Sequence, residues 1–516
     1  MIASALLLTL LPVAAMAQSV EDVVVTPQAS GRWLRAESEH VIVYSNEGAE
    51  VLRSSVEDLE AFDRMLRTVY GKLDDPPPRK YPIYLVRSVP RGSTENETYR
   101  RFMPDAPITS LSMGVDQVDD IFAVVVRDNF ALFGVTDRTQ GDDSVLSAYA
   151  AHFFSENFPF RQPRWLIKGA AIYYSSIDIR PDGMVVGAPS ALFDRDLLLR
   201  HVKRIDDVIA EAGFDWPYSE KQRYDVQSAL LVRYLWATPE RKARLATYLE
   251  RIEGGESDLR ATWAEVFGEP IETLQAHLTA FLSAEPTLTT LPRPAAPPPT
   301  ISIRRMPAGA EDLILEIQQL KSSRVVDNPA LLRKFRRVAK RRPNERYSRQ
   351  ALALAEITIG DRDAGERLLE TLLQEDGGNL EALRLMGSSK LRRAAGDPEH
   401  RARLLVSARD YLRRADAAEP NDYQTLFLLA QTMATGDAPS PERLALLRRA
   451  VALAPEVPLI RLTAAIAFLL ADDTQTAFQL LKPISADPYG GAAARKAKEI
   501  LDLMARMAVK PEAKAS

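Results

Sequence analysis

The side chains that could bind a metal ion or move a proton are few and widely scattered in this chain. It has five histidines and no cysteine, which removes thiolate metal sites, a cysteine nucleophile and disulfides. His152 and Glu156 are four residues apart and would share one face of a helix, where we expect an intrahelical pair and no metal. No histidine pair has the spacing with which a helix grips zinc. The histidines are His40, His152, His201, His277 and His400.

Other candidate groups have simpler explanations. Ser147 lacks the Gly-x-Ser-x-Gly setting of an exposed nucleophile. Asp142 and Asp143 precede a helical segment, and we expect Asp143 or Ser144 to cap that helix. His40 begins a β-branched stretch and is predicted to be a surface residue.

Two neighbouring helical segments carry the most informative pattern. The first is Val145-Leu-Ser-Ala-Tyr-Ala-Ala-His-Phe-Phe154, and the second is Pro163-Arg-Trp-Leu-Ile-Lys-Gly-Ala-Ala-Ile-Tyr-Tyr174. The pair resembles gluzincin-type metallopeptidases of the peptidase-MA-like group. In that family His-Glu-x-x-His is followed by Trp-Leu-x-Glu-Gly-x-Ala, whose Glu is the third zinc ligand. The histidines hold zinc, the first Glu is the general base, and the metal activates water. The resemblance covers about 250 residues.

The sequence retains structural residues of this motif but not its metal ligands or its general base. Trp165 matches the second element, but Lys168 stands at the position of its glutamate ligand. An ammonium group at that position would repel a metal ion. We expect Lys168 to form an ion pair with a carboxylate such as Glu156; the alternative is that it binds a carboxylate or phosphate in the former cleft.

Two alignments of the first element are possible. The favoured one puts Ser147 and Ala151 at the histidine positions and Ala148 at the general base, with Tyr149 and His152 matching residues that family members often have. A shift by one residue keeps His152 as a ligand and puts Ala148 and Tyr149 at the other two positions. Either alignment predicts a pseudo-peptidase without metal, cofactor or catalytic residue. The alternative is a hydrolase with a rearranged metal site that uses His152, Glu156 and a distant carboxylate.

The elements that would position this motif belong to an α+β region over residues 31–283. Strands are predicted at His40–Ser45, Tyr81–Val86 and Ile121–Val126, and a helix at Val51–Leu73. A proline-rich stretch at 284–306 follows. Because proline fixes φ and lacks an N–H, we expect an extended linker there that divides the chain into two bodies.

Residues 307–507 are predicted to be all-α. Helix-ending residues recur at spacings between 33 and 43 residues, and the longest interval holds a loop insertion at Gly396–His400. The segment resembles the tetratricopeptide repeat (TPR) family, whose members form helical solenoids that bind peptides and proteins. Its repeat-ending residues are Pro343, Gly377, Pro420, Pro455 and Pro488.

A basic run lies in the first helices of this array. It could meet an anionic partner, such as an acidic protein face or lipid phosphates, although a solvated helix face is the expected explanation. The net charge of −4 does not favour a general nucleic-acid binder. The run contains Arg333, Lys334, Arg336, Arg337, Lys340 and Arg341.

The two ends of the chain carry their own predictions. An apolar stretch at Ile2–Val13 followed by Ala15-Met16-Ala17 is typical of a signal peptide over residues 1–17, which places the mature protein in the periplasm without a membrane span. Residues 18–30 and 508–516 are expected to be tails. The sequence thus predicts an exported, non-catalytic binding or scaffold protein. A purely structural part of an envelope assembly is the remaining alternative.

Overall fold

The computed structural model describes most of the chain from Arg32 onward. The expected signal peptide and both tails lie outside the described residues, apart from Ala508. No helix in the described part is both long and apolar enough to cross a membrane. The described ranges are 32–87, 112–116, 120–127, 140–158, 163–180, 183–188, 205–209, 218–254, 256, 258–282, 288–292, 297–321, 328–434, 438–485 and 491–508.

A mixed six-stranded sheet organises the N-terminal part. Its strand order is β4-β5-β3-β2-β1-β9, with β2, β3 and β5 parallel and the outer strands antiparallel to their neighbours. The strands are β1 (Leu34–Glu37), β2 (Val41–Ser45), β3 (Tyr81–Arg87), β4 (Ser112–Asp116), β5 (Ile121–Arg127) and β9 (Ser302–Arg305). The three strands predicted from β-branched runs are confirmed as β2, β3 and β5.

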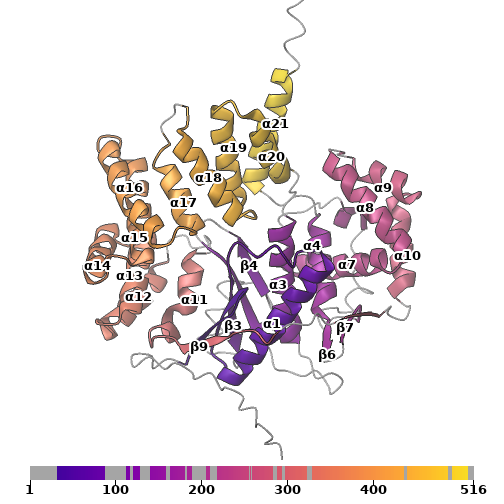
Figure 1. The fold of residues 1–516 in the computed structure, drawn as a ribbon, viewed down its shortest axis with the longest axis horizontal. Coiled ribbons are helices and arrows are strands. Elements are labelled where there is room, and N and C mark those ends of the chain that lie inside the picture. The colour runs from indigo at the N-terminus through magenta and orange to yellow at the C-terminus, as the bar shows by residue number, and fades with distance from the viewer. Residues whose placement is uncertain are drawn as a thin grey trace, which may run out of the picture.

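Both faces of the sheet are covered, which explains why its central strands are apolar throughout. Alternate side chains such as Val43 and Ile83 point into a core shared with α1 (Ala49–Val69) and α3 (Gln140–Asn157). The intervening residues, including Tyr84, pack on the opposite face against α11 (Ala310–Lys321). Figure 1 shows α1 and α3 together beside the sheet and α11 at a distance from both.

A helical subdomain follows the motif segment. Its core joins α4 (Arg164–Ser175) to the helices that come after it. A small sheet of order β6-β7-β8 completes this part. The elements are α6 (Ile205–Ile209), α7 (Tyr218–Trp236), α8 (Pro239–Gly254), α9 (Leu259–Phe267), η1 (Ile271–Thr273), α10 (Leu274–Leu282), β6 (Asp178–Arg180), β7 (Gly183–Val186) and β8 (Thr289–Leu291).

The C-terminal part is an array of paired antiparallel helices, as predicted. The expected insertion at Gly396–His400 joins the helices of one pair. Leu426 and Ala465, on the first helices of two later pairs, are fully buried. The helices after α11 are α12 (Pro329–Arg341), α13 (Arg346–Ile359), α14 (Arg362–Glu375), α15 (Leu380–Gly396), α16 (Arg401–Ala418), α17 (Tyr423–Gln431), α18 (Pro441–Leu453), α19 (Pro458–Leu470), α20 (Thr474–Ser485) and α21 (Gly491–Ala508).

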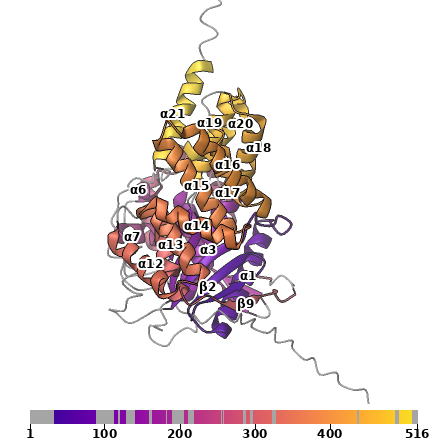
Figure 2. The ribbon, with the colours of Figure 1, turned by 90° about the vertical axis from the view of Figure 1, so that its left-hand side faces the viewer.

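The proline-rich stretch does not separate two independent bodies. Two of its segments form strands, since β8 pairs with β7 and β9 pairs with β1. Each is an edge strand, the position in a sheet that proline-flanked segments tolerate. Buried residues of the array also join the core of the sheet region. Figures 1 and 2 show the array curving along one side of the N-terminal part, which we call the α/β body.

Candidate functional site

The two segments of the predicted motif form packed neighbouring helices. Helix α3 carries Ser147, Ala148, Tyr149, Ala151, His152 and Glu156, and α4 carries Trp165 and Lys168. Trp165 is fully buried in the core between α4 and the subdomain helices, which gives it a packing role. Helix α3 begins at Gln140, so the prediction that Asp143 or Ser144 caps it is wrong; both lie inside the helix and are buried.

Gly169 accounts for part of the retained motif by close packing alone. A Cβ atom at this position would lie 2.4 Å from the carbonyl oxygen of Ser228 in α7. Helix α4 can therefore approach the backbone of α7 only because residue 169 has no side chain. The second motif segment thus has a structural reason for its glycine that is independent of catalysis.

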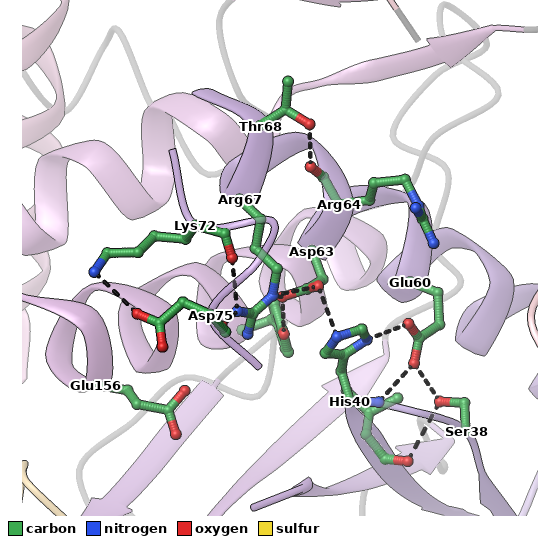
Figure 3. Close-up of polar contacts among 12 residues, drawn as sticks. Ser38, His40, Glu60, Asp63, Arg64, Arg67, Thr68, Lys72, Asp75 and Glu156 are labelled. Atoms are coloured by element: carbon green, nitrogen blue, oxygen red, sulfur yellow. Dashed lines mark hydrogen bonds and ion pairs between the residues drawn. The ribbon is translucent and has the colours of Figure 1, made fainter. Parts of the chain in front are cut away.

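Tyr149 belongs to a buried polar network that the sequence did not predict. Figure 3 shows other members of this network, among them His40, Asp63 and Arg67. The hydroxyl of Tyr149 donates to Asp63 Oδ1 at 2.6 Å. Arg67 Nε donates to the same carboxylate at 2.8 and 2.9 Å, and the ring of His40 lies 3.4 Å from Asp63 Oδ2. The other ring nitrogen of His40 contacts Glu60 Oε2 at 2.6 Å. The network ties the start of β2 to α1 and α3.

The surface position predicted for His40 is wrong, because its side chain is only 11% exposed. Burial alone would lower the pKa of His40. The hydrogen bond to Glu60 and the charges of Asp63 and Glu60 outweigh burial and raise the pKa. Both ring nitrogens face carboxylates, so the imidazolium form is favoured and neither nitrogen is available as a general base. The arrangement supports a structural role for His40.

His152 is buried where α3 meets β3. Its ring stacks on the ring of Tyr81 with centroids 3.7 Å apart and planes inclined by 4°. Burial lowers the pKa of His152 well below its ordinary value, and the positive charges of Arg79 and Arg67 add to this effect. The imidazole is therefore neutral at physiological pH. Nδ1 is buried and has no hydrogen-bond partner among the described residues.

A second polar cluster surrounds the guanidinium of Arg79 and joins α3 to the array. Arg79 donates to Glu456 and, at 2.6 Å, to the carbonyl oxygen of Leu453 at the end of α18. Glu156 Oε1 lies 3.8 Å from the same guanidinium. His152 completes the cluster, 3.8 Å from Glu456 and 3.9 Å from Glu156. We call Arg79, His152, Glu156 and Glu456 the junction cluster.

Glu156 has a different partner from the one predicted. Arg79 lies beside it, whereas no hydrogen bond or ion pair joins Lys168 to any described residue. Burial raises the pKa of Glu156 to about 7; Arg79 opposes this rise and Glu456 adds to it. Lys168 is half-buried on α4. The expectation of an ion pair between Lys168 and Glu156 is therefore wrong.

The junction cluster brings together ligand types that metals use, but a cation of the protein already sits among them. Within the described ranges, no three His, Asp or Glu side chains are arranged to hold a metal ion. Arg79 contacts Glu456 and lies near Glu156, so its positive charge opposes a metal ion at the same place. Sequence reasoning missed Arg79 and Glu456 because neither lies in a recognisable motif.

A surface pocket of about 940 Å³ lies elsewhere, at one end of strands β1, β3 and β9 and beside α1. None of the motif positions on α3 and α4 lines it. It adjoins the His40 network through Ser38 and Glu60, and the proline run at 297–299 forms another part of its wall. Its charged lining residues are Glu37, Glu39, Glu57, Glu60, Arg64 and Lys80.

The basic run of the sequence forms α12 and is partly neutralised within the array. Ion pairs join Lys334 to Glu316, Arg336 to Glu356 and Arg341 to Asp312. The remaining members are exposed at positions that recur along one side of the helix, and no ion pair joins them to another described residue. We call these three residues the basic stripe: Arg333, Arg337 and Lys340.

Comparison with known proteins identifies the array. Residues 328–434, which span α12 to α17, match the family described as Tetratricopeptide Repeats-Sensor. A solved structure of a thermophilic TPR protein from Thermus thermophilus shares 20% identity, covers 39% of this chain and 98% of that chain, and has a TM-score of 0.29. Curated proteins give no match. The family match lies outside α3 and α4, so the gluzincin resemblance stays a prediction. The C-terminal helices contain TPR repeats, which suggest a scaffold for protein–protein interaction.

Proposed function

We propose that this chain is an exported, non-catalytic scaffold protein. In this proposal the TPR array binds a protein or peptide partner, and the α/β body is a pseudo-metallopeptidase. The observation that carries the proposal is the TPR family match at residues 328–434, together with the paired helices there. Arrays of this type provide extended surfaces for polypeptides. Export to the periplasm rests on the apolar stretch before Gln18.

The side chains of α3 support the non-catalytic part of the proposal. In the favoured alignment Ala148 takes the position of the general base, and a methyl group cannot accept a proton. Ser147 and Ala151 take the histidine positions. Lys168 adds a positive charge on the adjacent helix. Hydrolysis would need groups other than those of the motif.

Zinc content tests this part of the proposal. We expect the mature protein, purified without chelators, offered zinc and then freed of excess, to hold less than about 0.1 zinc per chain by elemental analysis. About one zinc per chain that is lost in His152→Ala would contradict the proposal and support the rearranged hydrolase. His400→Ala serves as a control, because this exposed histidine lies far from the motif in the sequence and its loss should leave the zinc content unchanged.

The basic stripe suggests that the partner is negatively charged. A set of acidic and neutral 20-residue peptides tests this suggestion. We expect the full chain to prefer acidic peptides, and the double variant Arg333→Glu/Arg337→Glu to bind them roughly tenfold or more weakly at low salt. Arg401→Glu/Arg403→Glu on α16 is the matched control, because both residues are exposed and the change in charge is equal. Equal losses in both variants would show a general charge effect and contradict a binding role for the stripe.

A further inference from the structure

The array contacts its own α/β body at several points along one side. Tyr347 of α13 packs against the core on the outer face of the sheet. Lys321 of α11 pairs with Asp120 beside β5 at 3.0 Å, and it also lies 3.9 Å from Glu381 of α15. Further along, Arg79 lies over the ring of Tyr423 of α17. We call this side of the array its inner face.

The two ends of this contact are built differently. At the N-terminal end, β9 extends the sheet through backbone hydrogen bonds to β1. Helix α11 then buries apolar side chains such as Ile314 against the sheet. Both interactions are satisfied within the protein, because the hydrogen bonds are paired and the apolar surface is removed from water. This end is a fixed attachment.

The C-terminal end of the contact passes through the junction cluster. There Arg79 binds the last carbonyl of α18 and the side chain of Glu456 in the turn before α19. Four buried atoms of the cluster have no hydrogen-bond partner among the described residues: Arg79 Nε, His152 Nδ1, Glu156 Oε1 and Glu456 Oε2. They come from the segment before β3, from α3 and from the array. The unsatisfied atoms therefore gather on both sides of one boundary.

Separation at this boundary would let water reach all four atoms. A buried polar atom without a partner is unfavourable, and solvation on opening would offset part of the apolar contact that is lost. Arg79 provides the hydrogen bonds that oppose this separation. Its guanidinium also balances the adjacent carboxylates, which would otherwise repel each other. Arg79 thus provides the polar contacts that support closure at this end, beside the apolar side chains of α17 to α20 that share the core of the body.

We propose that Arg79 is a releasable latch that holds the inner face of the TPR array closed over the chain's own α/β body. Release would swing the helices after α15 away, while β9 and α11 stay attached to the sheet. A protein partner would then gain the inner face that the body covers. The access of a partner to the inner face rests on the proposed binding function of the array, whereas the latch itself does not.

The absence of cysteine from the chain allows a direct measurement of opening. Ser54 on α1 and Ala445 on α18 are exposed, so Ser54→Cys and Ala445→Cys would place two spin labels on opposite sides of the boundary. The distance distribution would be recorded in the full chain with Arg79→Ala and, separately, with Glu456→Gln, which keeps the size of the side chain. Arg413→Ala is the matched control, since Arg413 pairs with Glu442 on the exposed side of the array.

Arg79→Ala is expected to raise the long-distance population roughly ten- to hundredfold over the unsubstituted chain, the effect of losing a charged buried hydrogen bond. Glu456→Gln is expected to raise it by a smaller factor, because its amide oxygen can still accept from Arg79 and only the charge is lost. Hydrogen exchange should accelerate in α17 to α19 and stay slow in β9 and α11. The control should match the unsubstituted chain. Unchanged distances and exchange in both latch variants would overturn the proposal. So would an equal loss of protection in β9 and α11, which would mean that the whole core melts together.

A peptide-binding measurement separates the latch from the proposed function. The same set of acidic and neutral 20-residue peptides is used. If the opened variants bind more of these peptides than the unsubstituted chain does, the latch and the binding function are both supported. If they open and bind no additional peptide, access to the inner face does not control binding, and binding by that face is overturned while the latch stands.

Discussion

At the scale of single residues, Asp63 shows how a buried charge is kept. Its carboxylate accepts hydrogen bonds from Arg67 and Tyr149, and His40 lies within 3.4 Å. A buried carboxylate without such partners would be very unfavourable, and here donors arrive from α1 and α3 together with a nearby histidine. Tyr149 thus has a structural role at a position of the predicted motif.

Tyr149→Phe is expected to lower the free energy of unfolding by about 1 kcal/mol, because Asp63 loses one donor and keeps the other contacts. Urea unfolding followed by circular dichroism would measure the change. Tyr411→Phe is a suitable control, since Tyr411 is only partly buried and packs beside the array core. A loss below the experimental error for Tyr149→Phe would show that the hydroxyl contributes nothing to stability.

His40 should make stability depend on pH in a defined direction. Its pKa is raised in the folded protein, so the folded state binds the proton more tightly than the unfolded state. The stabilisation is fully present below the ordinary pKa of 6.5 and is lost as the pH rises through the folded value. We expect the unfolding free energy to fall from pH 6.5 upward, and His40→Gln to remove that component. An unchanged pH profile in the variant would contradict this assignment.

At the scale of elements, local sequence patterns predicted the central strands of the sheet and the repeated helices of the array. The β-branched runs gave β2, β3 and β5, and the helical repeat gave the paired helices of the array. Strands β1, β4 and β9 were not predicted, because they are short edge or near-edge strands without a strong apolar run. The pairing of β9 with β1 joins residues far apart in the sequence, and no local pattern records it.

The candidate site shows the same limit. His152 and Glu156 could be placed on one helix face by their spacing, but their surroundings could not. Arg79 and Glu456 are 377 residues apart, and their contact depends on how the array docks. The sequence identified the motif positions themselves. It assigned Lys168 the wrong partner, because Arg79, from the segment before β3, lies beside Glu156 instead.

Helix α3 carries two titratable groups, Glu156 and His152, whose contributions to stability change with pH in opposite directions. The pKa of Glu156 is raised to about 7, so its contribution to stability is lost as the pH rises from 4.5 through about 7. The pKa of His152 is lowered, so its contribution is lost as the pH falls through 6.5. Between pH 4.5 and 6.5 the two slopes oppose each other. The intact pair should therefore give little net pH dependence in this window.

Single substitutions should separate the two slopes. Relative to the unsubstituted chain, Glu156→Gln leaves the His152 contribution alone, and stability should fall as the pH decreases below 6.5. His152→Gln leaves the Glu156 contribution, and stability should fall as the pH rises from 4.5 to about 7. Urea unfolding across pH 4.5 to 8 measures both. Parallel profiles for the two variants would contradict opposite contributions.

At the scale of the whole molecule, the body and the array depend on each other. One face of the sheet is covered by α1 and α3, which belong to the body, and the other by α11, which belongs to the C-terminal part. Removing the C-terminal part would expose apolar side chains such as Tyr84 and Phe122. The proline-rich stretch therefore joins parts of one folding unit, even though its composition resembles that of a linker.

Ile314→Ala tests this dependence, because Ile314 is 3% exposed and lies where α11 meets the sheet. Truncation of a buried isoleucine typically costs about 2–5 kcal/mol. If the sheet and the array unfold as one unit, hydrogen-exchange protection should fall together in β3, β5 and α13. Val406→Ala is the control, because Val406 is 65% exposed and its truncation should change stability by less than about 0.5 kcal/mol. Loss of protection in α11 alone, with β3 and β5 unchanged, would show that the sheet is stable without its C-terminal cover. Such a result would restore the prediction of two independent bodies, so this single substitution distinguishes the two architectures.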